Sequence, residues 1–167
     1  MKRTSRNAMP SPGFRAGGFT LVEMMAVLSI FCILVTIAAP SYSSLIAGQR
    51  AGATATDIYV ALANARSEAI KRNTNTTLAN KSGGWQAGWQ SSVLDANNNT
   101  LVVDDHPATT GITLTGPDSV VYQSSGRVNA SSAPCFAIVA TQGSSVEYRW
   151  VAVDLSGRPV VKTTSCS

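Results

Sequence analysis

The sequence predicts an α+β protein in which one long N-terminal helix packs against a C-terminal domain of antiparallel strands. Two observations predict this fold. An apolar run begins at Phe19, and residues at helical spacing continue it as far as about Arg72. From Thr76 onward, short β-prone segments alternate with turn-rich ones. The 167 residues suffice for such a helix and one modest globular domain.

The first half of the expected helix is apolar enough to span a bilayer. Residues 24–39 contain no charged side chain, and Glu23 is the one charged residue between Phe19 and Pro40. A membrane-spanning helix needs about 20 apolar residues, so we expect residues 19–40 to form a transmembrane helix. Pro40 has no backbone N–H to continue the helical hydrogen bonds, which predicts a kink or local melting at its position.

After Pro40 the helical spacing resumes, which predicts a globular domain over residues 41–167 that begins with the rest of the helix. The residues expected on one stripe of this part are Leu45, Ile58, Leu62, Ala65 and Ala69. Eight strands should follow, separated by turns rich in Gly, Asn, Asp and Ser. The expected strands are Thr76–Asn80, Gly88–Asp95, Thr100–Asp104, Gly111–Thr115, Val120–Gln123, Cys135–Thr141, Val146–Leu155 and Pro159–Thr163.

The basic residues are concentrated before the apolar run. The whole chain has a formal charge of +4, but four of its 13 basic residues precede Phe19, and the remaining nine equal the nine acidic residues in number. The body is therefore about neutral, which gives no general support for nucleic-acid binding. Residues 1–18 are rich in Gly, Pro and Ser and are expected to be an unstructured leader. Their positive charges favour the cytoplasmic side, so the C-terminal domain should be exported.

The three cysteines differ in their surroundings. Cys32 lies within the apolar run, where it acts as a small apolar residue, whereas Cys135 and Cys166 lie in the polar C-terminal half. If that half is exported to an oxidising compartment, the natural disulfide joins Cys135 to Cys166. The two cysteines are 31 positions apart, and closing such a loop should stabilise the domain by roughly 3–4 kcal/mol if the effect is on the entropy of the unfolded chain.

The segment Gly18-Phe19-Thr20-Leu21-Val22-Glu23, with the basic leader before it and the apolar run after it, resembles the cleavage site of type IV prepilins. The resemblance implies that a prepilin peptidase cuts between Gly18 and Phe19 and that Phe19 becomes N-methylated. It also implies that Glu23 pairs with the amino terminus of a neighbouring subunit, which would offset the cost of a carboxylate in lipid. Pro40 stands at the usual helix-kink position of this family.

The same resemblance implies where the protein goes and what it contacts. The precursor would cross the inner membrane once, with its C-terminal domain in the periplasm. The mature subunit would then enter a pilus or pseudopilus at the cell surface. Its partners would be other major and minor pilins, bound through the N-terminal helix of residues 19–40, which would form the filament core.

Further motifs indicate a subfamily. Gly84-Trp85, Gly88-Trp89, Ser125-Gly126-Arg127 and Gly157-Arg158 together resemble the GspH/FimT-type minor pilins and pseudopilins. Three functions follow from this resemblance. The chain could prime or cap a type IV pilus, with a contribution to DNA uptake or adhesion. It could be a minor pseudopilin of a type II secretion system. It could also be a pilus subunit that binds DNA for natural transformation.

The DNA-binding hypothesis depends on the C-terminal residues. Some FimT-like minor pilins bind DNA through a Gly-Arg-x-Arg element, and this chain has Gly157-Arg158-Pro159-Val160, with valine in place of the second arginine. Lys162 follows two positions later, so on a strand it should share a face with Arg158. Arg158 and Lys162 are therefore the candidate DNA-binding residues. The other interpretation is a turn at Ser156-Gly157 beside a solvated arginine, which we favour because of Val160.

Other polar clusters give no case for a catalytic or metal site. Asp104-Asp105-His106-Pro107 contains the one histidine of the chain and reads as a loop, and residues 95–99 lack the Gly and Glu of a calcium loop and read as a turn. The three tryptophans, Trp85, Trp89 and Trp150, are expected to pack in the core or against the helix. No phosphate-binding loop or nucleophile–base pair is evident. We therefore expect no enzyme activity, no cofactor and no metal.

Overall fold

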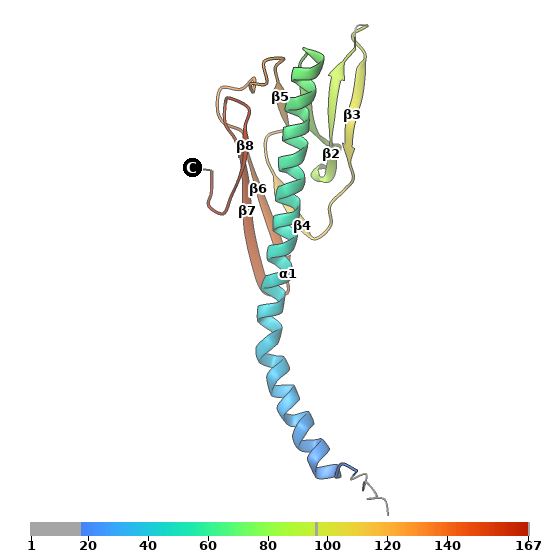
Figure 1. The fold of residues 1–167 in the computed structure, drawn as a ribbon, viewed down its shortest axis with the longest axis vertical. Coiled ribbons are helices and arrows are strands. Elements are labelled where there is room, and N and C mark those ends of the chain that lie inside the picture. Colours follow the sequence, from blue (N-terminus) through green and yellow to red (C-terminus); the bar gives the residue numbers. More distant parts are fainter. Residues whose placement is uncertain (1–17, 96, 167) are drawn as a thin grey trace, which may run out of the picture. The chain divides into compact units, whose positions relative to one another are not determined.

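The computed structural model describes residues 18–95 and 97–166, with only the backbone described at 38–40, and it confirms the α+β fold (Figure 1). Two compact units are present, Met1–Ile37 and Ala38–Ser167. The helix α1 (Leu21–Arg72) contributes residues to both units. The expected leader lies outside the described residues except for Gly18.

The first unit consists, in its described part, of Gly18 to Ile37, and every one of these residues is exposed. This part of α1 is long and apolar enough to cross a membrane. The few hydroxyl groups within it bond to the helix itself: Ser29 Oγ donates to the Met25 carbonyl at 2.8 Å and Thr36 Oγ1 to the Ile33 carbonyl at 2.7 Å. Such back-bonding satisfies a polar side chain in an apolar environment.

The helix α1 is continuous through Pro40, so the backbone shows no local melting there. The kink expected at Pro40 stays a prediction.

In the second unit, α1 buries four of the five residues expected on its stripe, and the other buried apolar residues of the stripe are alanines. The buried apolar residues are Ala47, Ala51, Ala55, Ile58, Ala61, Leu62, Ala65 and Ala69, and Thr54 is buried as well. The alanines let the strands approach the helix closely because their side chains occupy little space. Leu45, which we expected on this stripe, is instead exposed, since the buried face begins at Ala47.

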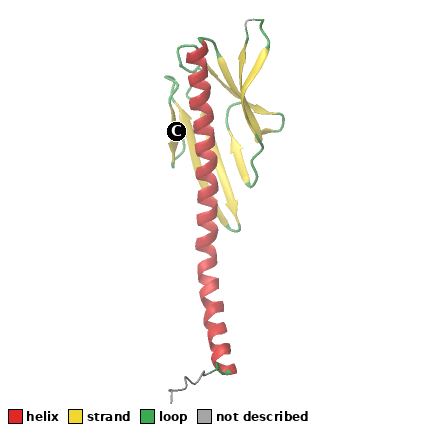
Figure 2. Cartoon of the chain, turned by 45° about the vertical axis from the view of Figure 1, so that its right-hand side comes forward, coloured by secondary structure: helices red, strands yellow, loops and turns green. Residues whose placement is uncertain are grey.

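All eight expected strands are present, with ends shifted by a few residues (Figure 2). They are β1 (Thr76–Lys81), β2 (Gly84–Leu94), β3 (Thr100–His106), β4 (Ile112–Thr115), β5 (Ser119–Tyr122), β6 (Cys135–Gln142), β7 (Ser145–Val153) and β8 (Pro159–Lys162). The pairs are antiparallel and form two sheets of four strands, in the orders β3-β2-β1-β5 and β4-β6-β7-β8. Both sheets contribute to one core together with the α1 stripe.

Two of the three tryptophans pack as expected. Trp85 and Trp89 on β2 are buried, and Trp85 donates from Nε1 to the Pro117 carbonyl at 2.8 Å. Trp150 was predicted wrongly. The buried side chains of β7 are those of Val151 and Val153, so Trp150 lies on the opposite face of the sheet, half-exposed, where it stacks on Tyr148 at 5.8 Å.

The predicted loop at residues 104–107 is also corrected. Asp104, Asp105 and His106 belong to β3, because their backbones pair with β2 from Ser91 to Trp89. The His106 ring stacks on Trp89 at 3.9 Å, and its Nε2 lies 3.8 Å from Asp57 Oδ2 on α1. The Asp95 turn is confirmed: Asp95 Oδ1 accepts the N–H groups of Asn97 and Asn99, each at 2.8 Å.

Candidate functional site

The predicted cleavage site lies directly before a capped helix start. Thr20 Oγ1 accepts the Glu23 N–H at 3.2 Å, while Glu23 Oε2 accepts the Thr20 N–H at 3.5 Å. This reciprocal pair is a capping box, which satisfies two N–H groups that the first helical turn leaves without a partner. The spacing Thr-x-x-Glu in the sequence could have predicted it. Glu23 therefore has a role within its own subunit besides the pairing implied by the family resemblance.

Gly18 has no structural constraint of its own in this fold. A Cβ atom added to it would meet no other atom within 4 Å, and Gly18 is exposed like its neighbour Phe19. A requirement for glycine here would therefore come from the enzyme that reads the site rather than from packing within the chain. The exposed apolar residues that follow, such as Phe31 and Leu34, need lipid or other helices to cover them.

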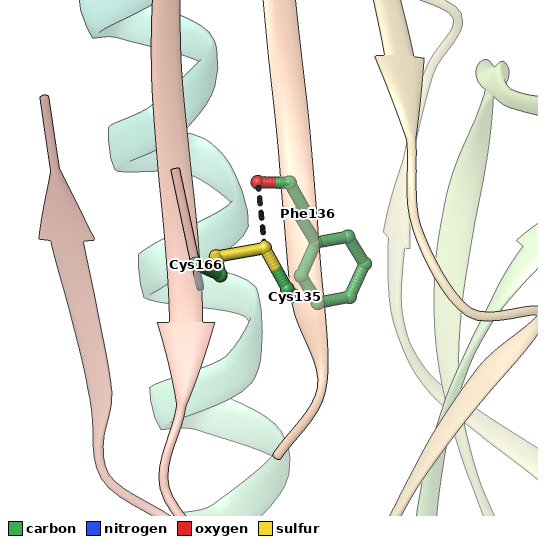
Figure 3. Close-up of a disulfide and its surroundings, with 3 residues drawn as sticks. All are labelled: Cys135, Phe136 and Cys166. Carbon is green, nitrogen blue, oxygen red and sulfur yellow. Dashed lines mark hydrogen bonds between the residues drawn. A yellow bond between two sulfur atoms is a disulfide. The ribbon is translucent and has the colours of Figure 1, made fainter. Parts of the chain in front are cut away.

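A disulfide joins Cys135, the first residue of β6, to Cys166 near the C-terminus (Figure 3). Their Cα atoms are 6.2 Å apart. In Figure 3 the Phe136 ring points away from the disulfide, toward the other side of β6, and Phe136 is fully buried. The bridge therefore ties the tail to a strand whose next side chain is in the core. Among the described cysteines, Cys32 is free and exposed.

The two glycine-containing turns noted in the sequence lie against one another. Gly157 and Gly126 both have positive φ angles, of 86° and 77°. A Cβ atom on Gly157 would collide with the Gly126 carbonyl, and one on Gly126 would press on Ile70 of α1. Glycine is needed at both positions for conformation and for space. The motifs Ser125-Gly126-Arg127 and Gly157-Arg158 are therefore two halves of one contact.

Asp154 holds the second of these turns in place. Its Oδ1 accepts the Ser156 hydroxyl at 2.6 Å and the Arg158 N–H at 2.9 Å, and its backbone carbonyl accepts the Gly157 N–H at 2.9 Å. The hydrogen bond from Ser156, followed by that from Arg158, holds the pKa of Asp154 below its usual value. The backbone of Arg158 is consequently fixed.

The two candidate DNA-binding residues differ in their surroundings. Lys162 pairs with Trp150 across the β7–β8 ladder, so its side chain lies on the outer face with Trp150. Arg158 precedes β8 and lines a cavity with residues of α1, among them Arg66. Because Arg158 lies directly before β8, the expected alternation of Arg158 with Lys162 stays a prediction.

Arg66 is a residue that the sequence did not single out. It is half-buried on α1, and its Nε donates to the Gly126 carbonyl at 3.1 Å, the same oxygen that a Cβ on Gly157 would strike. Nearby, the Tyr122 hydroxyl is buried without a hydrogen-bond partner among the described residues. Burial raises the pKa of Tyr122 well above its usual range. No signal in the local sequence links Arg66 to Arg158, because the two are brought together only by the fold.

These features define the class of protein: a pilin-like subunit with a processing site, a long apolar helix and a disulfide-bonded β domain. Residues 13–39 match the prokaryotic N-terminal methylation motif, and residues 54–157 match the family described as type II transport protein GspH. The chain belongs to the GspH family. A comparison with curated protein sequences found no match.

Solved structures of minor pilins and pseudopilins share the fold. The type IV minor pilin FimU of Pseudomonas aeruginosa (strain PAO1) superposes with a TM-score of 0.58 at 18% identity, covering 68% of this chain and 89% of FimU. The minor pseudopilin EpsH from the type 2 secretion system of Vibrio cholerae superposes with a TM-score of 0.55 at 16% identity, covering 68% of this chain and 97% of EpsH. At these identities the similarity shows the fold alone.

Family membership and the methylation motif together establish the coarse biology of the chain. It is a structural subunit and not an enzyme, it is processed by a prepilin peptidase, and it assembles with other pilins. Its apolar helix anchors it in a membrane before assembly. Within the described residues, no group of three or more His, Cys, Asp or Glu side chains is placed to hold a metal ion.

Proposed function

We propose that this chain is a minor pilin that primes or caps assembly of a type IV pilus. The observation that carries the proposal is the exposed apolar surface of residues 19–37, which begins at the predicted cleavage site. Such a surface is stable only in lipid or against other helices, and transfer between those two environments is the step that places a subunit in a filament.

The proposed sequence of events assigns a role to each part of the chain. Residues 1–18 are the leader, residues 19–40 the transmembrane and filament-core helix, and residues 41–167 the pilin-like domain. The precursor crosses the inner membrane once with this domain in the periplasm. The peptidase cuts after Gly18, Phe19 is N-methylated, and Glu23 then pairs with the amino terminus of a neighbouring subunit. A bend at Pro40 would let the helix adapt to the filament.

One genetic experiment distinguishes a role in a type IV pilus from a role in a type II secretion system. The gene is deleted in the producing bacterium and restored on a plasmid, and two quantities are measured: surface pili released by shearing, and proteins released through a type II secretion system. We expect fewer pili, unchanged secretion, and recovery of pili with the plasmid. Loss of secretion with normal pili would show instead that the chain is a minor pseudopilin, as EpsH is in the type 2 secretion system of Vibrio cholerae.

DNA binding for natural transformation is the second candidate function. The observation that favours it is the exposed Arg158 on a turn fixed by Asp154, next to the turn that carries Arg127. Two or three phosphate contacts would give weak binding that falls steeply with salt. Detergent-solubilised full chain is titrated with fluorescent duplex DNA at low salt. Binding that is lost in Arg158→Gln with Lys162→Gln, but kept in the control Lys81→Gln, would support the candidate. Absence of binding by the wild-type chain would remove it.

A further inference from the structure

A cavity of about 370 Å³ in the second unit is lined by two arginines from distant parts of the chain. Arg66 comes from α1 and Arg158 from the turn before β8. Tyr59, Ile70 and Pro159 form its apolar walls, and Ser67 adds a hydroxyl group. The cavity therefore combines two positive charges with a partly apolar lining.

Neither arginine has an acidic side chain within ion-pair distance in the described part of the chain. Other basic side chains do: Arg72 pairs with Glu68 and Arg149 with Glu147. The Oδ1 atom of Asp154 bonds the Ser156 hydroxyl and the Arg158 backbone rather than the Arg158 guanidinium group. Asp154 attracts Arg158 electrostatically, but two positive side chains that line one cavity still repel each other. An anion bound beside both guanidinium groups would reduce this repulsion.

The two arginines are supported differently before any ligand arrives. The Arg66 side chain is held by the hydrogen bond from its Nε to the Gly126 carbonyl, whereas for Arg158 the backbone is held, by the bond from its N–H to Asp154. The turns of Gly126 and Gly157 contact each other, so the carbonyl that Arg66 bonds lies against the turn that precedes Arg158. The Nη groups of Arg66 have no hydrogen-bond acceptor among the described residues, so they remain available as a planar fork for an oxyanion.

We propose that this Arg66–Arg158 cleft is a docking site for a carboxylate side chain of a neighbouring filament subunit. The inference rests on the proposed function, because it requires that the chain assembles with other subunits. Charge complementarity identifies the occupant: two guanidinium forks beside apolar walls fit one Asp or Glu side chain and the apolar surface around it. Tight binding of a nucleic acid uses several positive charges along its track, whereas this cavity is lined by two, and Lys162 lies on the outer face of the sheet with Trp150.

The first test uses the full chain in detergent micelles with isotope-labelled arginine. The probe is N-acetylglutamate α-methylamide, which carries one side-chain carboxylate. Its matched neutral control is the corresponding glutamine derivative, and inorganic phosphate is a third probe. We expect the carboxylate, but not the amide, to move the Nε–H signals of Arg66 and Arg158. Arg66→Gln or Arg158→Gln should weaken binding about tenfold or more, as loss of a charge-assisted bond implies. Arg127→Gln should not.

Two results of this titration would overturn the proposal. One is the absence of any movement of the two arginine signals with the carboxylate. The other is movement by phosphate at lower concentration than by the carboxylate, which would make the cleft a phosphate site. Because Arg66→Gln also removes the bond to Gly126, the exposed Arg158→Gln variant keeps the test independent of folding.

The second test is incorporation into filaments in the producing cell. Sheared filaments and membranes are probed for the wild-type chain, Arg158→Glu and the control Arg127→Glu. We expect Arg158→Glu to be processed normally and to fall several-fold in filaments, with the control unchanged. If the wild-type chain is itself missing from filaments, the proposed function fails. If it is present and Arg158→Glu is incorporated equally, only the cleft proposal fails.

Discussion

The two units of the molecule differ in the exposure of their apolar side chains. In the first unit, Phe31 is 59% exposed, and every other described residue is exposed as well. In the second unit, Phe136 and Ile58 are completely buried. The second unit therefore stabilises itself by its own core, whereas the first depends on lipid or on other subunits. Substitutions in the first unit should change processing and assembly, and those in the second should change the free energy of unfolding.

The largest expected effect is on processing. Gly18→Trp should leave the precursor uncut, because a bulky side chain would block the peptidase. Thermal unfolding of the second unit should not change, since a Cβ at Gly18 contacts no described residue beyond its chain neighbours. Intact-mass measurement of membrane protein reports both forms. A wild-type mature chain that begins anywhere other than at Phe19 would contradict the predicted cut.

The variant Glu23→Leu, also in the first unit, distinguishes membrane insertion from filament assembly. Glu23→Leu removes a carboxylate, which would cost roughly 2.5–3.5 kcal/mol at the centre of a membrane-spanning helix and less in the first turn, where Glu23 lies. Membrane insertion should therefore be kept or improved. Incorporation into filaments should be largely lost, because the pairing with a neighbouring amino terminus disappears. Glu23→Gln is the matched control. It keeps an oxygen that can accept the Thr20 N–H but removes the charge, so it tests the effect of the charge alone. Filament levels equal to wild type in Glu23→Leu would refute the pairing.

A matched pair of phenylalanines tests the contrast between the units directly. Phe136→Ala should destabilise the second unit by about 3–5 kcal/mol, because it leaves a cavity beside Trp85, whose ring centre lies 4.9 Å away. Phe31→Ala should leave the unfolding of the second unit unchanged, since Phe31 belongs to the exposed helix surface. Denaturant unfolding of both variants in detergent, followed by tryptophan fluorescence, measures the difference. Equal destabilisation by both would show that the units unfold together.

Removing the disulfide should have a similar or slightly smaller effect. Cys166→Ser is expected to destabilise the second unit by roughly 3–4 kcal/mol, with hydrogen exchange rising first in the C-terminal tail. Cys32→Ser in the first unit is the control and should leave unfolding unchanged, because Cys32 is free and exposed. Detection of free thiols at both Cys135 and Cys166 in the exported wild-type domain would contradict the bridge.

Local patterns account for much of the agreement between sequence and structure. The helical period led to the end of α1 at Arg72, and alternating β-prone and turn-rich segments located all eight strands. What they could not give is the pairing of strands: β1 lies between β2 and β5, a non-local arrangement that no local period encodes. Trp150 was misplaced although the alternation of Val151 and Val153 indicates the buried face.

The candidate site also has parts that the sequence could predict and a part that it could not. The cleavage motif is contiguous, so it could be recognised from the sequence, and the capping box of Thr20 and Glu23 was within reach of the same reasoning. The Arg66–Arg158 cleft was out of reach, because α1 and the β7–β8 turn meet only in the folded second unit. The expectation that Arg158 shares a face with Lys162 stays a prediction, because Arg158 lies directly before β8.

The smallest expected effect concerns the pH dependence of the turn that supports Arg158. Hydrogen bonds from Ser156 and Arg158 hold the pKa of Asp154 below its ordinary value of 3.8, so its folded pKa is lower than its unfolded one. The Asp154 carboxylate therefore stabilises the second unit above pH 3.8 and loses its contribution as the pH falls through the folded pKa.

The variant Asp154→Asn keeps an acceptor oxygen but does not titrate. The extra stability of the wild-type chain over this variant should therefore be present at neutral pH and vanish in acid. Thermal unfolding of both chains across this range measures it. Asp95→Asn is the control, because the pKa of Asp95 is also lowered by hydrogen bonds but in a turn that does not include Arg158. An advantage of wild type over Asp154→Asn that grows as the pH falls would show the opposite sign of shift, and the support for Arg158 would then need another explanation.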